Sequence, residues 1–153
     1  MITDLMREDH EAGREIFAVA GNSPFEATAE REAALSHLVR LWRAHGAMME
    51  EAVLPALDGT FENPGALSDV RERQATVAEL AADLARRADR SNDQDLGDPS
   101  LWYTDFERLK ATFEEQCLIE AGTLIPLLQH DLAPERIGVL TRTARAVRLR
   151  EGV

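Results

Sequence analysis

The 153-residue chain has a formal net charge of −11, with 44% hydrophobic and 29% charged residues, which suits one folded domain and excludes wholesale disorder. The acidic balance argues against a nucleic-acid backbone or an anionic membrane surface as the main partner. Cys117 is the only cysteine, and neither a signal peptide nor an apolar run of membrane-spanning length is present, so we expect a cytoplasmic protein.

The first half of the chain predicts two helices. Residues that favour helices dominate it, and alternating β-type runs are absent. The first helix is expected from a cap at about Thr3 to the stop "GNSP" at 21–24. The second is expected to start at Ser23–Pro24, where serine supplies a cap and proline suits the first turn, and to run through His45 towards Pro55.

The second half predicts two more long helices and a shorter one. After the turn-rich stretch "DGTFENPGALSD", Ser68 or Asp69 is expected to cap a helix that ends near Asp89. Beyond a polar loop, Asp98 caps the next helix, with Pro99 at its first position and an end around 122–126. A last segment starts near "DLAPER" and carries one apolar stripe, formed by Ile137, Leu140, Ala144 and Val147.

These elements predict an all-α fold, an antiparallel up-down four-helix bundle over residues 1–128 with a short C-terminal fifth helix over 129–153 packed on it. The last segment is rich in arginine, in an otherwise acidic chain. We expect it to dock on its own bundle, and a homodimer contact is the alternative.

Polar residues interrupt the apolar face of every long helix. A three-then-four spacing predicts inward-facing stripes on the long helices, including Met6, Gly13 and Phe17 on the first, Leu38, Met49 and Ala52 on the second, Val70, Val77 and Leu84 on the third, and Phe106, Leu109 and Phe113 on the fourth. His10, His45, Gln74, Gln116 and Glu120 fall at core positions of the same spacing. A buried polar group without a partner costs roughly 1–3 kcal/mol, so we expect these side chains to contact one another, an ion or trapped water.

The chain also repeats itself weakly. "HGAMMEEAVLP" and "QCLIEAGTLIP" align, because His45 and Pro55 are ten positions apart, as are Gln116 and Pro126. "REDHEAGREIF" and "RERQATVAEL" open the two halves, with His10 opposite Gln74. A duplicated αα-hairpin would place one pseudo-twofold site at the middle of the bundle.

These segments resemble the hemerythrin-like (HHE cation-binding) family over about residues 3–127. In that family each hairpin supplies a His from its first helix and a His-x-x-x-Glu from its second, and two bridged irons handle dioxygen, peroxide or nitric oxide. The resemblance implies that His10, His45 and Glu120 are metal ligands. Met49 stands where the other bridging glutamate belongs, and Gln74 and Gln116 stand where two histidines belong.

The incomplete ligand set does not favour an intact di-iron centre, since a neutral amide is a poor ligand for iron beside imidazole and a thioether suits copper. Two imidazoles and one carboxylate could hold a single iron ion, or a zinc ion with water as fourth ligand. The same three groups could equally form a metal-free hydrogen-bonded cluster.

Two functional hypotheses remain. The first is a hemerythrin-like protein with a degenerate site that binds one non-haem metal and handles or senses a small diatomic or peroxide ligand. The second is a metal-free bundle that acts as a binding or regulatory module. No catalytic triad, phosphate loop or nucleotide fingerprint is present, so no hydrolase or transferase activity is supported.

The sequence raises one further alternative at Glu50, which a single-turn π-bulge would swing onto the face of His45. Without such a shift, the five-residue step from His45 to Glu50 separates them by about 140° around the helix. We predict that Glu50 faces solvent.

Overall fold

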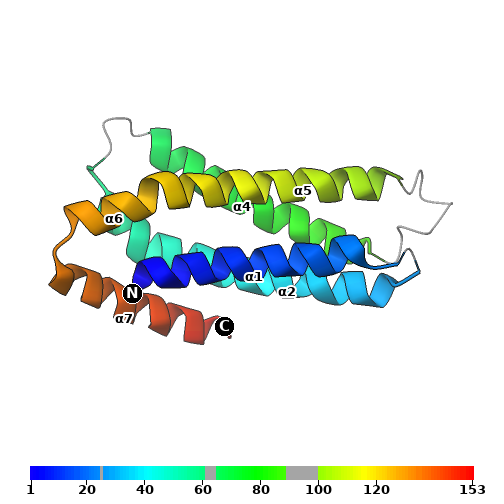
Figure 1. The fold of residues 1–153 in the computed structure, drawn as a ribbon, viewed down its shortest axis with the longest axis horizontal. Coiled ribbons are helices and arrows are strands. Elements are labelled where there is room, and N and C mark those ends of the chain that lie inside the picture. Colours follow the sequence, from blue (N-terminus) through cyan, green and yellow to red (C-terminus); the bar gives the residue numbers. More distant parts are fainter. Residues whose placement is uncertain (25, 61–64, 89–99) are drawn as a thin grey trace.

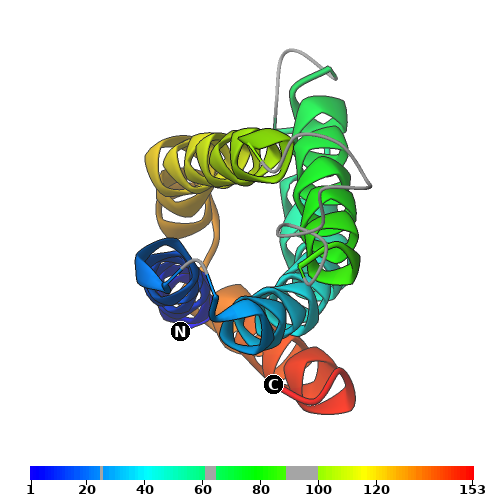
Figure 2. The same ribbon diagram turned by 90° about the vertical axis from the view of Figure 1, so that its right-hand side faces the viewer.

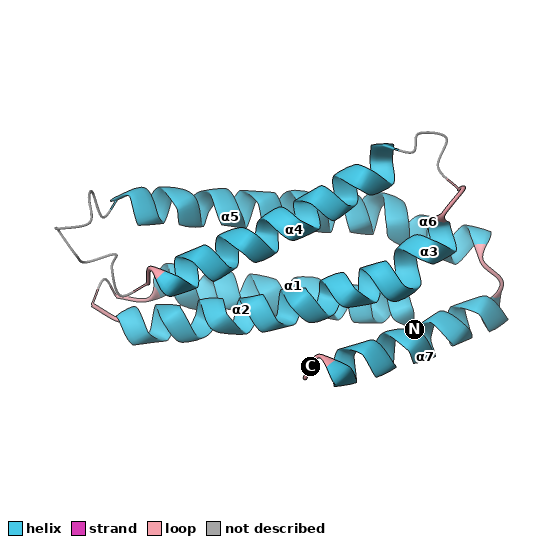
Figure 3. Cartoon of the chain, turned by 180° about the vertical axis from the view of Figure 1, so that it is seen from behind, coloured by secondary structure: helices cyan, strands magenta, loops and turns pink. Residues whose placement is uncertain are grey.

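The computed structural model describes residues 1–24, 26–60, 65–88 and 100–153. Within these ranges the chain is helical with short connections and has no strand (Figure 3). The helical elements are α1 (Ile2–Asn22), α2 (Thr28–Met48), the π-helical segment η1 (Met49–Val53), α3 (Leu54–Leu57), α4 (Gly65–Arg86), α5 (Ser100–Ile119), the π-helical segment η4 (Glu120–Leu124), α6 (Ile125–Asp131) and α7 (Pro134–Arg150). None of the described helices combines the length and apolar character needed to cross a membrane.

The long helices α1, α2, α4 and α5 lie alongside one another (Figure 1) and surround a common interior when seen end-on (Figure 2). Within this arrangement α2 packs against both α1 and α4, and α4 packs against α5. The C-terminal helix α7 lies outside the group, against α1 and α2. The expected domain boundary at 128/129 falls inside α6.

The interior divides into two apolar clusters. One contains Trp42, Phe113 and Cys117, and the other contains Met6, Met49 and the buried face of α7. Burying these side chains supplies the main stabilisation of the fold, at about 25 cal/mol for each Å² of apolar surface removed from water. A polar layer lies between the two clusters, formed by the buried residues His10 of α1, His45 of α2 and Glu120 of η4.

The predicted core stripes are largely confirmed. The side chains that the periodicity placed on the inner faces of α1, α2 and α5 are buried, as are Leu140, Ala144 and Val147 of α7. Ile137 is half-buried and packs against the apolar cluster that contains Met6 and Met49. Gln74 is the exception on α4, because its side chain is only half-buried.

Several predicted helix starts were wrong. Thr3, the expected cap of the first helix, is the second residue of α1, and α2 begins at Thr28. Ser23 does not cap α2, because its hydroxyl donates back to the Ala20 carbonyl at 2.7 Å and so belongs to the end of α1. Ser68 and Asp69 lie inside α4, which begins at Gly65. The predicted boundary residues Asp89, Asp98 and Pro99 lie outside the described residues.

The fourth long helix does not end at 122–126. The backbone stays helical through η4 and α6 to Asp131. Pro126 is accommodated because it is the second residue of α6, directly after the widened π turn, and Pro55 holds the same place in α3 after η1. Proline lacks an amide hydrogen and is tolerated in the first turn of a helical segment, so neither proline ends its helix.

Candidate metal centre

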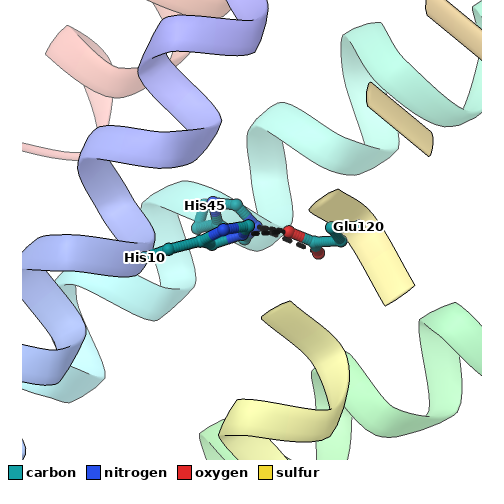
Figure 4. Close-up of side chains that lie close together, drawn as sticks. All are labelled: His10, His45 and Glu120. Carbon is teal, nitrogen blue, oxygen red and sulfur yellow. Dashed lines mark hydrogen bonds and ion pairs between the residues drawn. The ribbon is translucent and has the colours of Figure 1, made fainter. Parts of the chain in front are cut away.

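Three buried side chains from three helical elements meet in the polar layer. His10 comes from α1, His45 from α2, and Glu120 is the first residue of η4 (Figure 4). Each is at most 3% exposed. One ligand atom from each side chain lies within 4.8 Å of the others, so the group could hold a metal ion. The structure thus brings together all three residues that the sequence nominated as ligands.

The Glu120 carboxylate joins the two imidazoles. Its Oε2 lies 2.5 Å from Nε2 of His10 and 3.0 Å from Nε2 of His45, and its Oε1 lies 3.2 Å from the same His45 nitrogen. Each short contact requires a proton between nitrogen and oxygen, so the group is internally hydrogen-bonded. Two ligand atoms on one zinc ion are roughly 3 Å or more apart, so an ion would replace these protons and widen the His10–Glu120 contact.

Asp9 belongs to the candidate site, although the sequence analysis did not predict it. It is 1% exposed, and its Oδ2 accepts a hydrogen bond from Nδ1 of His45 at 3.0 Å. Its other carboxylate oxygen accepts from the Arg148 guanidinium of α7. A carboxylate on the far nitrogen of a histidine fixes the ring orientation and directs the other nitrogen towards a metal. Its position directly before His10 was the only signal in the sequence.

The charges of the site balance in the metal-free state. Burial alone would lower the pKa of His45, but the charge of Glu120 and the hydrogen bonds with Asp9 and Glu120 raise that pKa to about 9. Burial opposes ionisation of Glu120, yet the two histidines lower its pKa to about 2. At neutral pH the imidazolium of His45 therefore offsets the carboxylate of Glu120, and Arg148 forms an ion pair with Asp9.

The two glutamines have separate roles. Gln116 is fully buried, donates from Nε2 to Oε1 of Glu120 at 2.9 Å, and accepts from Nε of Arg73 at 3.1 Å. Gln74 instead donates to the backbone carbonyl of Trp42 at 3.0 Å, and its buried Oε1 has no partner among the described residues. The five polar side chains expected at core positions therefore do not all meet in one group, because Gln74 is bonded to the backbone of α2.

Aromatic rings close the site on one side. The Trp42 ring stacks on His45 with centroids 4.5 Å apart and planes 14° apart, and Phe113 lies 4.9 Å from Trp42. A Cβ added to Gly13 would lie 2.4 Å from Cζ of Phe113, so only glycine lets the ring pack here. Apolar walls exclude water and strengthen the electrostatic contacts beside them.

The prediction for Glu50 is confirmed. The second helix does contain a π-helical turn, but it begins at Met49, and Glu50 remains exposed and pairs with Arg71 at 2.8 Å. Met49 is 1% exposed and joins an apolar cluster. An equivalent π turn begins at Glu120. Met49 and Glu120 each stand six residues before a proline, so the two halves agree in backbone geometry and differ in the side chain at this position.

Comparison of the chain with models of protein families finds no matching family, and neither the curated proteins nor the solved structures give a match.

Proposed function

We propose that this chain is a hemerythrin-like protein, an antiparallel up-down four-helix bundle with a C-terminal helix, in which the di-iron site of the family is reduced to one metal position. Two features support the family assignment. The residues that match the family's ligand pattern, His10, His45 and Glu120, come together in the interior. The paired π turns, each followed by a proline, support a duplicated hairpin.

The observation that carries the proposal is the buried group of two imidazoles and one carboxylate, backed by Asp9. Such a set suits one iron or zinc ion and leaves coordination positions free. A bound iron would supply an open position for dioxygen, peroxide or nitric oxide, so we assign the chain to the handling or sensing of such ligands. His10, His45 and Glu120 would hold the ion, Asp9 orients His45, and the neighbouring Trp42 ring shields the site from water.

The side chains around Gln116 do not favour the second metal ion that the family binds. That amide is engaged on both sides, with Glu120 and with the guanidinium of Arg73. A guanidinium cannot lose its proton in a protein, so its fixed positive charge opposes a second cation nearby. A single ion is therefore the most that the proposal assigns.

The second candidate is a metal-free binding or regulatory module. It is favoured by the closed network itself, because the buried charges of the site balance without an ion. Under this alternative, His10→Ala affects only stability, through a cavity and an orphaned partner.

Metal analysis decides between the two. Protein purified from iron-replete cells is assayed for iron and zinc, then stripped with chelator and melted with and without added iron(II), zinc or manganese. If the chain binds one metal ion, we expect about one ion per chain and a rise in melting temperature when metal is added, since a ligand that binds only the folded state stabilises that state. Wild type and His37→Ala, an exposed histidine off the site, should respond alike, and His10→Ala should not respond.

The absence of both bound metal and any melting shift in the wild type would reject the metal site and leave the metal-free module.

A further inference from the structure

A cavity of about 620 Å³ lies between the start of α1, the end of α6 and the part of α7 from Pro134 to Arg145. Apolar side chains form most of its surface, among them Leu132, Pro134 and Ile137. Its volume falls within the range of small-molecule sites, about 300–1,000 Å³. None of the candidate metal ligands lines it, so it is a separate feature of the molecule.

Two arginines that have no carboxylate partner among the described residues lie at this cavity. Arg142 and Arg145 are three residues apart on α7, so their side chains share one face of the helix. In the part of the chain that the structure describes, neither forms an ion pair, whereas Arg148 pairs with Asp9 and Arg150 with Glu51. Both charges are exposed and lie beside an apolar surface in a chain of net charge −11.

An unsatisfied polar atom also lines the cavity. Thr3 is 1% exposed, and its buried hydroxyl oxygen has no hydrogen-bond partner among the described residues. A buried hydroxyl without a partner is destabilising in protein interiors. A ligand oxygen at the cavity wall would accept a hydrogen bond from it.

We infer that this cavity binds a monomeric anionic amphiphile, with one carboxylate head and an unbranched apolar tail. The head would pair with Arg142 and Arg145, since guanidinium groups form strong charge-assisted hydrogen bonds with carboxylates. The tail would cover the apolar wall and gain free energy from its burial. The two guanidinium groups repel a cationic head, and the net charge of the chain opposes nucleic acid and anionic membranes.

Calorimetric titration with decanoate, kept below its aggregation concentration, tests this inference. EDTA is present throughout, so the result does not depend on the metal site. We expect saturable binding with one decanoate per chain, no binding of acetate, which lacks the tail, and at least about tenfold weaker binding of decyltrimethylammonium, which lacks the carboxylate. Equal affinity for the cationic amphiphile, no saturable binding of decanoate, or binding only to phosphatidylglycerol vesicles would each overturn the inference.

Variants then locate the site. Arg142→Gln/Arg145→Gln removes both charges and should weaken decanoate binding at least about tenfold, as expected for loss of a charge-assisted contact. Gly138→Leu should block the cavity: an added Cβ meets only the Arg142 guanidinium, at an ordinary 3.8 Å, so the helix can accept the side chain. Arg136→Gln is the matched control, an exposed arginine of α7 that does not line the cavity, and should bind as wild type does.

Circular dichroism and melting curves establish that each variant is folded before titration. Unchanged decanoate affinity in both the double glutamine variant and the leucine variant would place binding elsewhere and overturn the inference.

Discussion

Replacing Asp9 by asparagine tests whether the C-terminal helix supports the candidate site. Asparagine keeps the size of the side chain and removes its charge, so no cavity is formed. Asp9 is 1% exposed and holds both His45 and Arg148, whose side chain is 14% exposed. Breaking a buried ion pair by removing one partner costs about 3–5 kcal/mol, and the partial exposure of Arg148 places the expected loss near 3 kcal/mol.

The loss is measured by urea unfolding of the metal-free protein, with Asp4→Asn as control. Asp4 is an exposed acid of the same helix that pairs with the chain's amino group, and its replacement should change stability little. Adding Arg148→Met to Asp9→Asn removes the orphaned charge, so the double variant should be more stable than the sum of the single effects predicts. Zinc affinity should fall by about 10–100-fold in Asp9→Asn. A loss below about 1 kcal/mol together with additive single effects would show that the contact between Asp9 and Arg148 does not stabilise the site.

Three further predictions follow from the geometry of the interior. Gly13→Ala should lower the free energy of unfolding, measured in urea, by about 1–2 kcal/mol, because overpacking against Phe113 outweighs the gain in helix propensity. Gly122→Ala should not destabilise the protein, since the space around an added Cβ is open there. Equal effects of the two variants would contradict the close packing of Phe113 on Gly13. The metal-free protein should be most stable from about pH 4.5 to 6.5. Because folding raises the pKa of His45 to about 9, stability should fall as the pH rises from about 6.5 through 9. Because folding lowers the pKa of Glu120 to about 2, stability should also fall as the pH drops from about 4.5 towards 2. A flat urea-midpoint profile across both windows would show that these groups are not coupled to folding. Zinc binding at pH 7 should release at least about one proton per ion, because Nε2 of His45 must lose its proton to bind the metal. Calorimetry in buffers of different ionisation enthalpy measures the number of protons released, and a binding heat that is the same in every buffer would contradict the prediction.

Helical periodicity was sufficient to predict most of the interior. The stripe of α1 and that of α5 are buried as expected, because a 3.6-residue repeat specifies which side chains share a face. The same argument placed His10, His45 and Glu120 inside, and buried polar side chains require hydrogen-bond or ion partners. The candidate site could therefore be nominated from three positions on three helices.

The missing parts depend on information that periodicity does not contain. The role of Asp9 follows from where α7 docks, since Arg148 reaches it from 139 residues away in the chain. Gln74 lies on the expected stripe, but its long side chain ends at the backbone of Trp42, and a stripe does not specify where the tip of a flexible side chain goes. Pro55 and Pro126 were interpreted as helix ends, because a 3.6-residue pattern does not reveal the π turn that precedes each of them.

The matching π turns bear on the history of the chain. A π turn closes its hydrogen bond over one residue more than an α turn, so each marks an extra residue within an otherwise regular helix. Because η1 and η4 each begin six residues before a proline, a single insertion in one ancestral hairpin, copied by duplication of that hairpin, would account for both. Positions 49 and 120 now differ in chemistry while their backbone still agrees, so distant relatives should be recognised first by this inserted residue and its proline.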